Sequence, residues 1–198
     1  MSQEERLQNL IFLKYGNPHA EKICKCGNGL RVIKCRDDGC FQYQTSCRDC
    51  FIKKHRDNPF HWALVWDTEK KAWNQNDYSE LAVDCSIQLH HTDDEICTGV
   101  KSSNVLRVTH TNGIHTTRVR FCGCEGTPDK LEQLMEAGLF PGTTSEPRSA
   151  YTFAVLKEFH MHNLQSKCGA FDYVLSLRRL TDNVFTSKVP VSYLFSDN

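Results

Sequence analysis

The sequence of 198 residues has no long hydrophobic run and no excess of charge of either sign. Its N-terminus, MSQEERLQNLIFLKYG, lacks the basic segment and apolar stretch of a secretory signal peptide, and no apolar run is long enough to span a bilayer. These absences predict an intracellular protein with no membrane partner. The formal net charge of zero also gives no general sign of nucleic-acid binding, which would need a local basic face.

Signals of catalysis are lacking as well. The sequence shows no nucleophile with a nearby base, no paired carboxylates and no open metal site, which argues against an enzyme such as a ubiquitin ligase. We therefore expect a non-catalytic domain without a small-molecule substrate.

Cysteine, by contrast, is abundant. The chain has eleven cysteines, an odd number, so disulfides alone would leave one thiol unpaired. In a reducing compartment, closely spaced cysteines with nearby histidines indicate a metal site instead.

Six cysteines and two histidines between residues 24 and 61 form four ligand pairs, spaced as C-x-C, C-x4-C, C-x2-C and H-x5-H. Eight ligands are the number that two closed tetrahedral zinc sites need, and ions with four protein ligands are structural. The pairs are Cys24 and Cys26, Cys35 and Cys40, Cys47 and Cys50, and His55 and His61.

Two arrangements are possible. Either neighbouring pairs bind the same ion, or alternate pairs do, and the second arrangement is called a cross-brace. LRVIKC and CFQYQTSC each predict a short strand, and a hairpin between them would bring the first and third pairs together. We therefore favour the cross-brace, whose ligand order resembles that of B-box and ZZ zinc-binding domains. One ion would bind Cys24, Cys26, Cys47 and Cys50, and the other Cys35, Cys40, His55 and His61.

A third zinc site is predicted further along the chain. VLRVTH, TNGI and HTTRVRFC indicate a β-hairpin with a turn at Asn112 and Gly113, and its second strand runs into a C-x-C motif. LHHTDDEIC lies before the hairpin. The predicted ligands are His91, Cys97, Cys122 and Cys124, with His90 or His115 as alternatives to His91.

The rest of the chain predicts an α+β fold. Residues 1–20 hold a helix whose apolar residues, among them Leu7, Leu10 and Ile11, are expected to pack on the zinc module of residues 21–68. Residues 69–198 are predicted to form a small antiparallel sheet with the third zinc site and C-terminal helices. The tryptophans behind the first cluster fit an aromatic platform or a core, and we favour the core.

Basic residues suggest two places for phosphate contacts. One is the predicted short helix after the third cysteine pair, for which a solvated helix face is the other interpretation, and the second is the hairpin. The candidates are Arg48, Lys53, Lys54, Arg56, Arg118 and Arg120.

Several segments together resemble a known family. They are the cysteine cluster with HRDNPFHWALVW behind it, NGIHTTRVRFCGC, GLFPGTTSEPRSAYTFAVLKEFH and YVLSLRRLTDN. From about residue 7 to the end, the chain is similar to the CxC cysteine-cluster domain joined to the KDZ (Kyakuja–Dileera–Zisupton) transposases of fungi. LHHTDDEIC departs from that pattern, in which a glycine precedes the histidine and the gap to the cysteine is shorter.

The resemblance implies a zinc-binding recognition domain for DNA or chromatin in the nucleus, with any transposase catalytic region outside this chain. The alternative is a protein-interaction module of the B-box or ZZ kind. Such a module would hold a peptide or histone tail, or associate with itself, without binding DNA.

Overall fold

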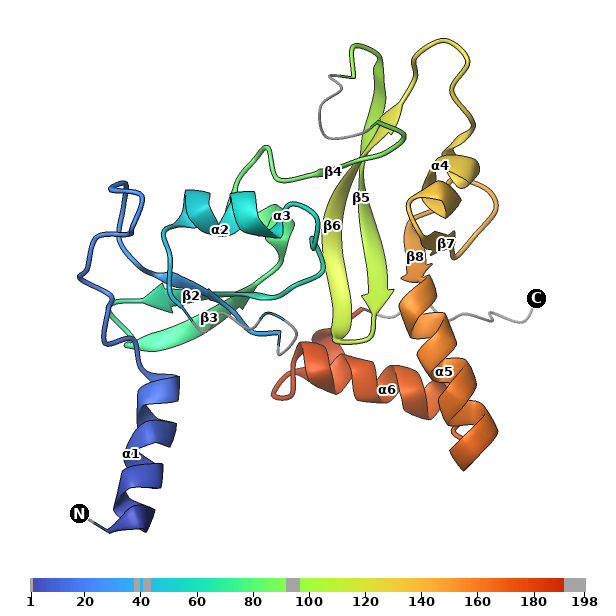
Figure 1. The fold of residues 1–198 in the computed structure, drawn as a ribbon. Helices are drawn as coiled ribbons and strands as arrows, with labels where there is room; N and C mark the ends of the chain where they lie inside the picture. The colour runs from blue at the N-terminus through green and yellow to red at the C-terminus, as the bar shows by residue number, and fades with distance from the viewer. Residues whose placement is uncertain (1, 38–39, 41–43, 92–96, 191–198) are drawn as a thin grey trace. The chain divides into compact units, whose positions relative to one another are not determined.

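The computed structural model describes residues 2–37, 40, 44–91 and 97–190, and it divides into two compact units, Met1–Cys85 and Ser86–Asn198 (Figure 1). The boundary expected between residues 68 and 69 falls inside the first unit. It lies in the turn between β2 (Ala63–Asp67) and β3 (Ala72–Asn76), which pair along their whole length. This antiparallel ladder holds β3 against β2 within the first unit.

The first unit is built on a three-stranded antiparallel sheet in the order β1-β2-β3, with β1 at Ile33–Cys35. Two helices accompany it, α2 (Arg48–His55) and α3 (Tyr78–Leu81). A small buried cluster joins sheet and helices, and its members are Ile33, Phe51, Ala63, Tyr78, Leu81 and Cys85.

The hairpin expected between residues 30–35 and 40–47 is present in part. Ile33 and Ser46 form an antiparallel bridge and exchange backbone hydrogen bonds of 3.0 and 2.8 Å, whereas residues 41–43 of the predicted second strand lie outside the described residues. β1 also has a neighbour that was not expected, because it forms an antiparallel ladder with β2 in which Cys35 lies opposite Ala63.

The predicted N-terminal helix forms as α1 (Gln3–Tyr15) and begins with a capping box between Ser2 and Glu5. The expectation that its apolar residues pack on the zinc module is wrong, because none of its residues is buried. Two contacts tie its C-terminal end to the sheet: Lys34 Nζ donates to the Lys14 carbonyl at 2.8 Å, and Trp73 Nε1 donates to the Gly16 carbonyl at 3.3 Å.

The second unit contains a five-stranded sheet in the order β4-β6-β5-β8-β7. The strands are β4 (Ile87–Gln88), β5 (Val100–His110), β6 (Gly113–Cys122), β7 (Leu139–Pro141) and β8 (Ser149–Thr152). The β5–β6 and β7–β8 pairs are antiparallel, whereas β4–β6 and β5–β8 are parallel. The sheet is therefore mixed rather than wholly antiparallel, because β4 and β8 reach the central hairpin through longer connections.

The β5–β6 hairpin confirms the predicted one, with a shift at its turn. His110 pairs with Gly113, so Thr111 and Asn112 form the two-residue loop. Gly113 has a φ of 144°, a conformation that residues with a side chain rarely adopt.

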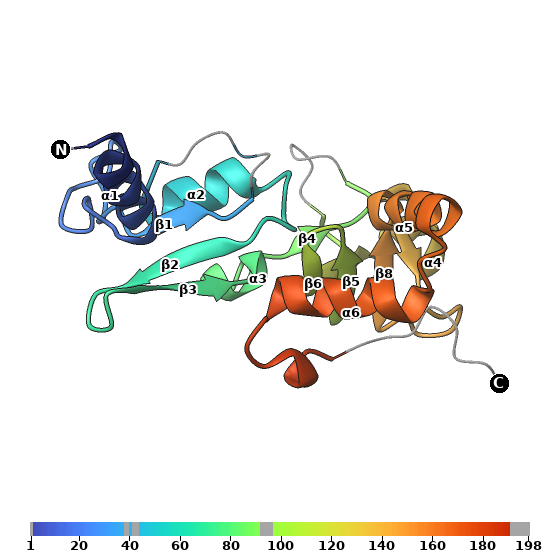
Figure 2. The same ribbon diagram turned by 90° about the horizontal axis from the view of Figure 1, so that it is seen from below.

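Three helices complete the second unit: α4 (Lys130–Glu136), α5 (Phe153–Ser166) and α6 (Ala170–Thr181), followed by a short 3-10 turn at Thr186–Lys188. Figure 2 shows α6 crossing the β5–β6 hairpin. Apolar residues between these helices and the sheet form the core, and they are Ile114, Tyr151, Val155, Tyr173, Leu177 and Val189. Among the described residues, no helix has the length and hydrophobicity needed to cross a membrane.

Candidate metal centres

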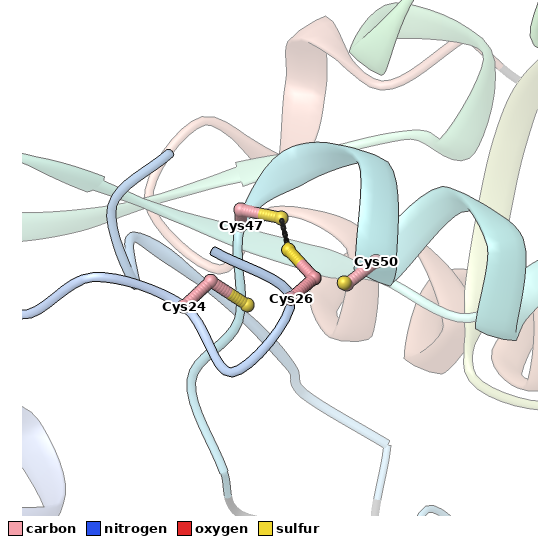
Figure 3. Close-up of side chains that lie close together, drawn as sticks. All are labelled: Cys24, Cys26, Cys47 and Cys50. Carbon is pink, nitrogen blue, oxygen red and sulfur yellow. Dashed lines mark hydrogen bonds between the residues drawn. The ribbon is translucent and has the colours of Figure 1, made fainter. Parts of the chain in front are cut away.

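The first cluster joins two cysteines of a loop to two cysteines at the start of α2 (Figure 3). Cys24 and Cys26 lie in the loop before β1, Cys47 is the N-cap of α2, and Cys50 lies in its first turn. The sulfur atoms of Cys26 and Cys47 are 3.5 Å apart, and all four sulfurs lie within 4.8 Å of one another. Gly29, with a φ of 73°, lets the loop pass close to Cys47.

The second cluster places two cysteines against two histidines. Sγ of Cys40 lies 3.5 Å from Nε2 of His55, and Sγ of Cys35 lies 3.6 Å from Nδ1 of His61. His55 is buried, and its Nδ1 lies 3.0 Å from the Phe51 carbonyl one turn earlier on α2. The carbonyl can accept a hydrogen bond only if Nδ1 carries the ring proton, and that tautomer leaves Nε2 able to bind a metal.

The third cluster lies at the end of the β5–β6 hairpin. Cys122 ends β6 and Cys124 follows it, whereas His91 and Cys97 come from the connection between β4 and β5. Nε2 of His91 is 2.9 Å from Sγ of Cys122, and Sγ of Cys97 is 3.6 Å from Sγ of Cys122 and 3.9 Å from Sγ of Cys124. These four ligand atoms also lie within 4.8 Å of one another.

The two alternative ligands lie elsewhere. Nδ1 of His90 is 3.0 Å from a carboxylate oxygen of Glu136 on α4. His115 is buried, with Nε2 at 2.8 Å from Oδ1 of Asn112 in the hairpin turn. The structure therefore brings together His91, rather than either alternative, with the three cysteines.

All three clusters share one local feature, a backbone N–H···S contact. In each, the backbone N–H two residues after a cysteine points at its sulfur, which favours the thiolate form. The N–H···S pairs are Asn28 to Cys26 at 3.4 Å, Asp37 to Cys35 at 3.4 Å and Cys124 to Cys122 at 3.3 Å. Only in the third cluster does the N–H belong to the second cysteine of a pair, whereas Asn28 and Asp37 are not cysteines.

The thiols of one cluster differ in acidity. The backbone N–H of Cys26 lowers the pKa of Cys24 to about 6, whereas hydrogen bonding to the sulfurs of Cys26 and Cys47 raises the pKa of Cys50 to about 12. The third cluster repeats the contrast: hydrogen bonds from Cys122 and His91 lower the pKa of Cys124 to about 6, and burial raises that of Cys122. Crowded thiols resist joint ionisation, and a divalent cation removes that resistance.

The ligand chemistry fits zinc. A tetrahedral zinc site with Zn–S bonds of about 2.3 Å holds its sulfurs about 3.8 Å apart. Sulfur–sulfur distances of 3.5 Å in the first cluster and of 3.6 and 3.9 Å in the third agree with that geometry. Each cluster supplies four ligands, and the second and third combine thiols with imidazoles, which borderline-soft ions prefer. Three Cys/His clusters can thus hold metal ions.

The two remaining cysteines lie outside these clusters. Cys85 is buried in the core of the first unit, and Cys168 packs on the core of the second. Of the tryptophans, only Trp62 is buried, whereas Trp66 and Trp73 are half-exposed and form an edge-to-face pair with ring centroids 5.0 Å apart.

Two supporting residues of the third cluster were not anticipated. Gln133 of α4 is buried, accepts from the Cys122 N–H at 2.9 Å and donates to the Cys122 carbonyl at 3.0 Å. Gly99 lies so close to Cys124 that a Cβ there would come within 3.1 Å of its backbone nitrogen. A glutamine or a glycine in a sequence does not indicate support of a metal site. The contacts arise only because α4 packs beside Cys122 and the segment before β5 passes close to Cys124.

The fold and clusters define the class: a mixed α+β protein with three Cys/His clusters able to hold metal ions. A family model described as "CxC2 like cysteine cluster associated with KDZ transposases" matches residues 82–185. The chain belongs to this family, which confirms the family resemblance found in the sequence for residues 82–185. The extension of that resemblance to the cysteine cluster of residues 24–61 stays a prediction. The B-box and ZZ likeness concerns residues before that range and stays a prediction. No curated protein and no solved structure matches the chain.

Proposed function

We propose that the three clusters bind structural zinc ions and that this transposase-associated domain binds duplex DNA in the nucleus, mainly through the phosphate backbone. The observation that carries the DNA proposal is a row of arginines on one face of the β5–β6 hairpin. Zinc would fix the loops that carry the cluster residues, while basic side chains contact the phosphates.

The register of the hairpin sets the arginine row. Arg118 lies opposite Val105, and Arg107 lies opposite Thr116. Residues opposite each other in a ladder share a face, and so do residues two apart in a strand, so Arg120 joins them. Val105 is 63% exposed and Thr116 is exposed, so this part of the face is open to solvent.

The sequence of the two strands makes this face positively charged. β5 and β6 contain four Lys or Arg residues and no Asp or Glu. The Nε atom of Arg120 is buried and has no hydrogen-bond partner within the described part of the chain. A local basic face is what a chain with zero net charge needs in order to bind phosphates. Arg107 was not among the sequence candidates and joins them here.

The basic residues of α2 form a separate group. Lys53, Lys54 and Arg56 are exposed at the C-terminal end of this helix. Arg48 differs, because its guanidinium donates to the Leu81 carbonyl at 3.0 Å and so ties α2 to α3. We therefore assign Arg48 a structural role and keep the other three as candidate phosphate contacts.

The tryptophans speak against one form of the alternative, a cage for a methylated lysine of a histone tail. Such a cage needs open aromatic ring faces. Lys34 Nζ already lies over the Trp73 ring, 4.1 Å from its centroid, and Trp73 is also in an edge-to-face contact with Trp66. Peptide binding in another form remains an outcome of the test below.

The test is a fluorescence-anisotropy titration of the zinc-loaded chain with labelled duplex DNA at several salt concentrations. Each phosphate contact contributes about −0.9 to the slope of log K against log salt. R118Q/R120Q should weaken binding to every duplex and reduce the slope by about two. K157Q, which removes an exposed lysine of α5, is the matched control and should leave the slope unchanged.

Absence of binding to any duplex at low salt would reject the DNA proposal. Equal slopes for the double variant and for K157Q would reject the arginine row as the contact surface. If the chain binds peptides in an array but does not bind DNA, the protein-interaction alternative would be favoured instead.

A further inference from the structure

α1 is a helix whose apolar residues are left uncovered. Leu7, Leu10 and Ile11 are 60%, 54% and 55% exposed, and no residue of the helix is buried. A helix of 13 residues is only marginally stable in water by itself, and in proteins its stability comes mainly from packing an apolar stripe. The capping box at Ser2 adds only a modest stabilisation, so this helix lacks its main source of stability.

We propose that α1 pairs with α1 of a second copy of this chain, in antiparallel orientation. The proposal does not depend on DNA binding or on the identity of the metal. It rests on the order of residues along one stripe of the helix. Glu4, Leu7, Ile11 and Lys14 follow a spacing of three, four and three, which places them on one side as in the seam of a coiled coil.

The charges on this stripe select both the partner and the direction. With two copies antiparallel, Glu4 of each faces Lys14 of the other, and Leu7 of each faces Ile11 of the other. A parallel pair would instead set Glu4 against Glu4 and Lys14 against Lys14. The stripe is therefore complementary to itself under a two-fold axis, which is the requirement for an isologous interface.

The remaining contacts of α1 leave this stripe accessible. The contacts at its C-terminal end use the backbone carbonyls of Lys14 and Gly16, not the Lys14 side chain, which is exposed. At the other end, the carboxylate of Glu5 closes the capping box by accepting the Ser2 N–H at 2.6 Å. Glu4 does not take part in the cap and is exposed.

The test is sedimentation equilibrium of the full zinc-loaded chain at low salt over a range of concentrations. We expect a monomer–dimer equilibrium that L7D abolishes. E4K and K14E should each weaken the dimer about tenfold, because each sets like charges together at both symmetric contacts. The double reversal E4K/K14E should restore the dimer towards the affinity of the unmodified chain.

The double variant separates pairing from helix stability. A lysine at the N-terminus and a glutamate at the C-terminus both oppose the helix dipole, so the double variant should have the least stable helix of the series. F12A is the control, because Phe12 is 73% exposed and lies off the stripe, about 100° around the helix from Ile11, and it should leave the dimer unchanged.

Three results would overturn the proposal. The first is a chain that stays monomeric at every concentration. The second is a dimer that survives L7D, since another surface then forms it. The third is a double reversal that binds more weakly than either single reversal. Circular dichroism of each variant checks that the units stay folded, as expected for changes on a helix without buried residues.

Discussion

Replacing Cys47 by serine should unfold the first unit. Cys47 is 4% exposed, supplies a ligand atom to the first cluster and is the N-cap residue of α2. Phe51 and His55 of the same helix are buried, in the core and in the second cluster respectively. Loss of this ligand therefore disturbs the first cluster, the core and the second cluster together.

The magnitude follows from the small size of that core. The buried cluster of the first unit has six residues, one of them an alanine and one a cysteine. A structural zinc site contributes an apparent binding free energy of about 10–16 kcal/mol, which equals or exceeds the whole net stability of a typical domain, about 5–15 kcal/mol. Loss of one ion is thus enough to unfold the unit.

The assay combines elemental analysis of the purified chain with thermal unfolding followed by circular dichroism. We expect C47S to hold one zinc ion instead of three, since only the third of the three clusters survives. C85A is the matched control, because Cys85 is buried in the same unit but belongs to none of the three Cys/His clusters. This variant should keep three ions and lose about 1–2 kcal/mol of unfolding free energy. A C47S chain with full metal content and an unchanged melting curve would refute a metal-held first unit.

Three further predictions concern the metal sites. H91A should reduce the zinc content by one ion, whereas H90A should not; equal metal contents would place the fourth ligand elsewhere. Q133L should cost about 1–3 kcal/mol of unfolding free energy, because it leaves the buried Cys122 N–H without a partner, and an unchanged melting temperature would argue against this bridge. Acid should release the metal: bound ligands are deprotonated, so their pKa in the folded state lies below the unfolded thiol value of about 8.5. The stabilisation of the fold by metal is then complete above the unfolded pKa and is lost as the pH falls through the folded pKa. The measurement is the amount of metal that the chain retains after dialysis at each pH.

Much of the metal chemistry can be read from the order of residues. The cysteines of each pair are two, three or five positions apart, so the pairs follow from local geometry. The N–H···S contacts are local too, because each joins a sulfur to the N–H two residues later. The helix α1 and the hairpin of residues 105–122 are also local features, which explains why both were predicted. Short-range spacing is visible in a sequence because the chain between such residues has few conformations.

Long-range strand pairings were predicted less well. β1 was expected to pair with residues 40–47, of which Ser46 forms a bridge to Ile33, but its longer pairing with β2 was not expected. Both neighbouring segments have short strand-like patterns, and such patterns do not state which strands pair. Arg107 was not predicted as a phosphate contact, because its position on the same face as Arg118 follows only from the register of the hairpin.

The sequence by itself determined which atoms are available to bind metal and how they are paired locally, because those properties depend on residue type and on a few bonds of chain. The order of residues also favoured the cross-brace and His91, but the tertiary structure decided between these and their alternatives. It alone decided that the stripe of α1 stays uncovered. These outcomes depend on the balance between competing packings of distant segments, and that balance is set by the whole fold.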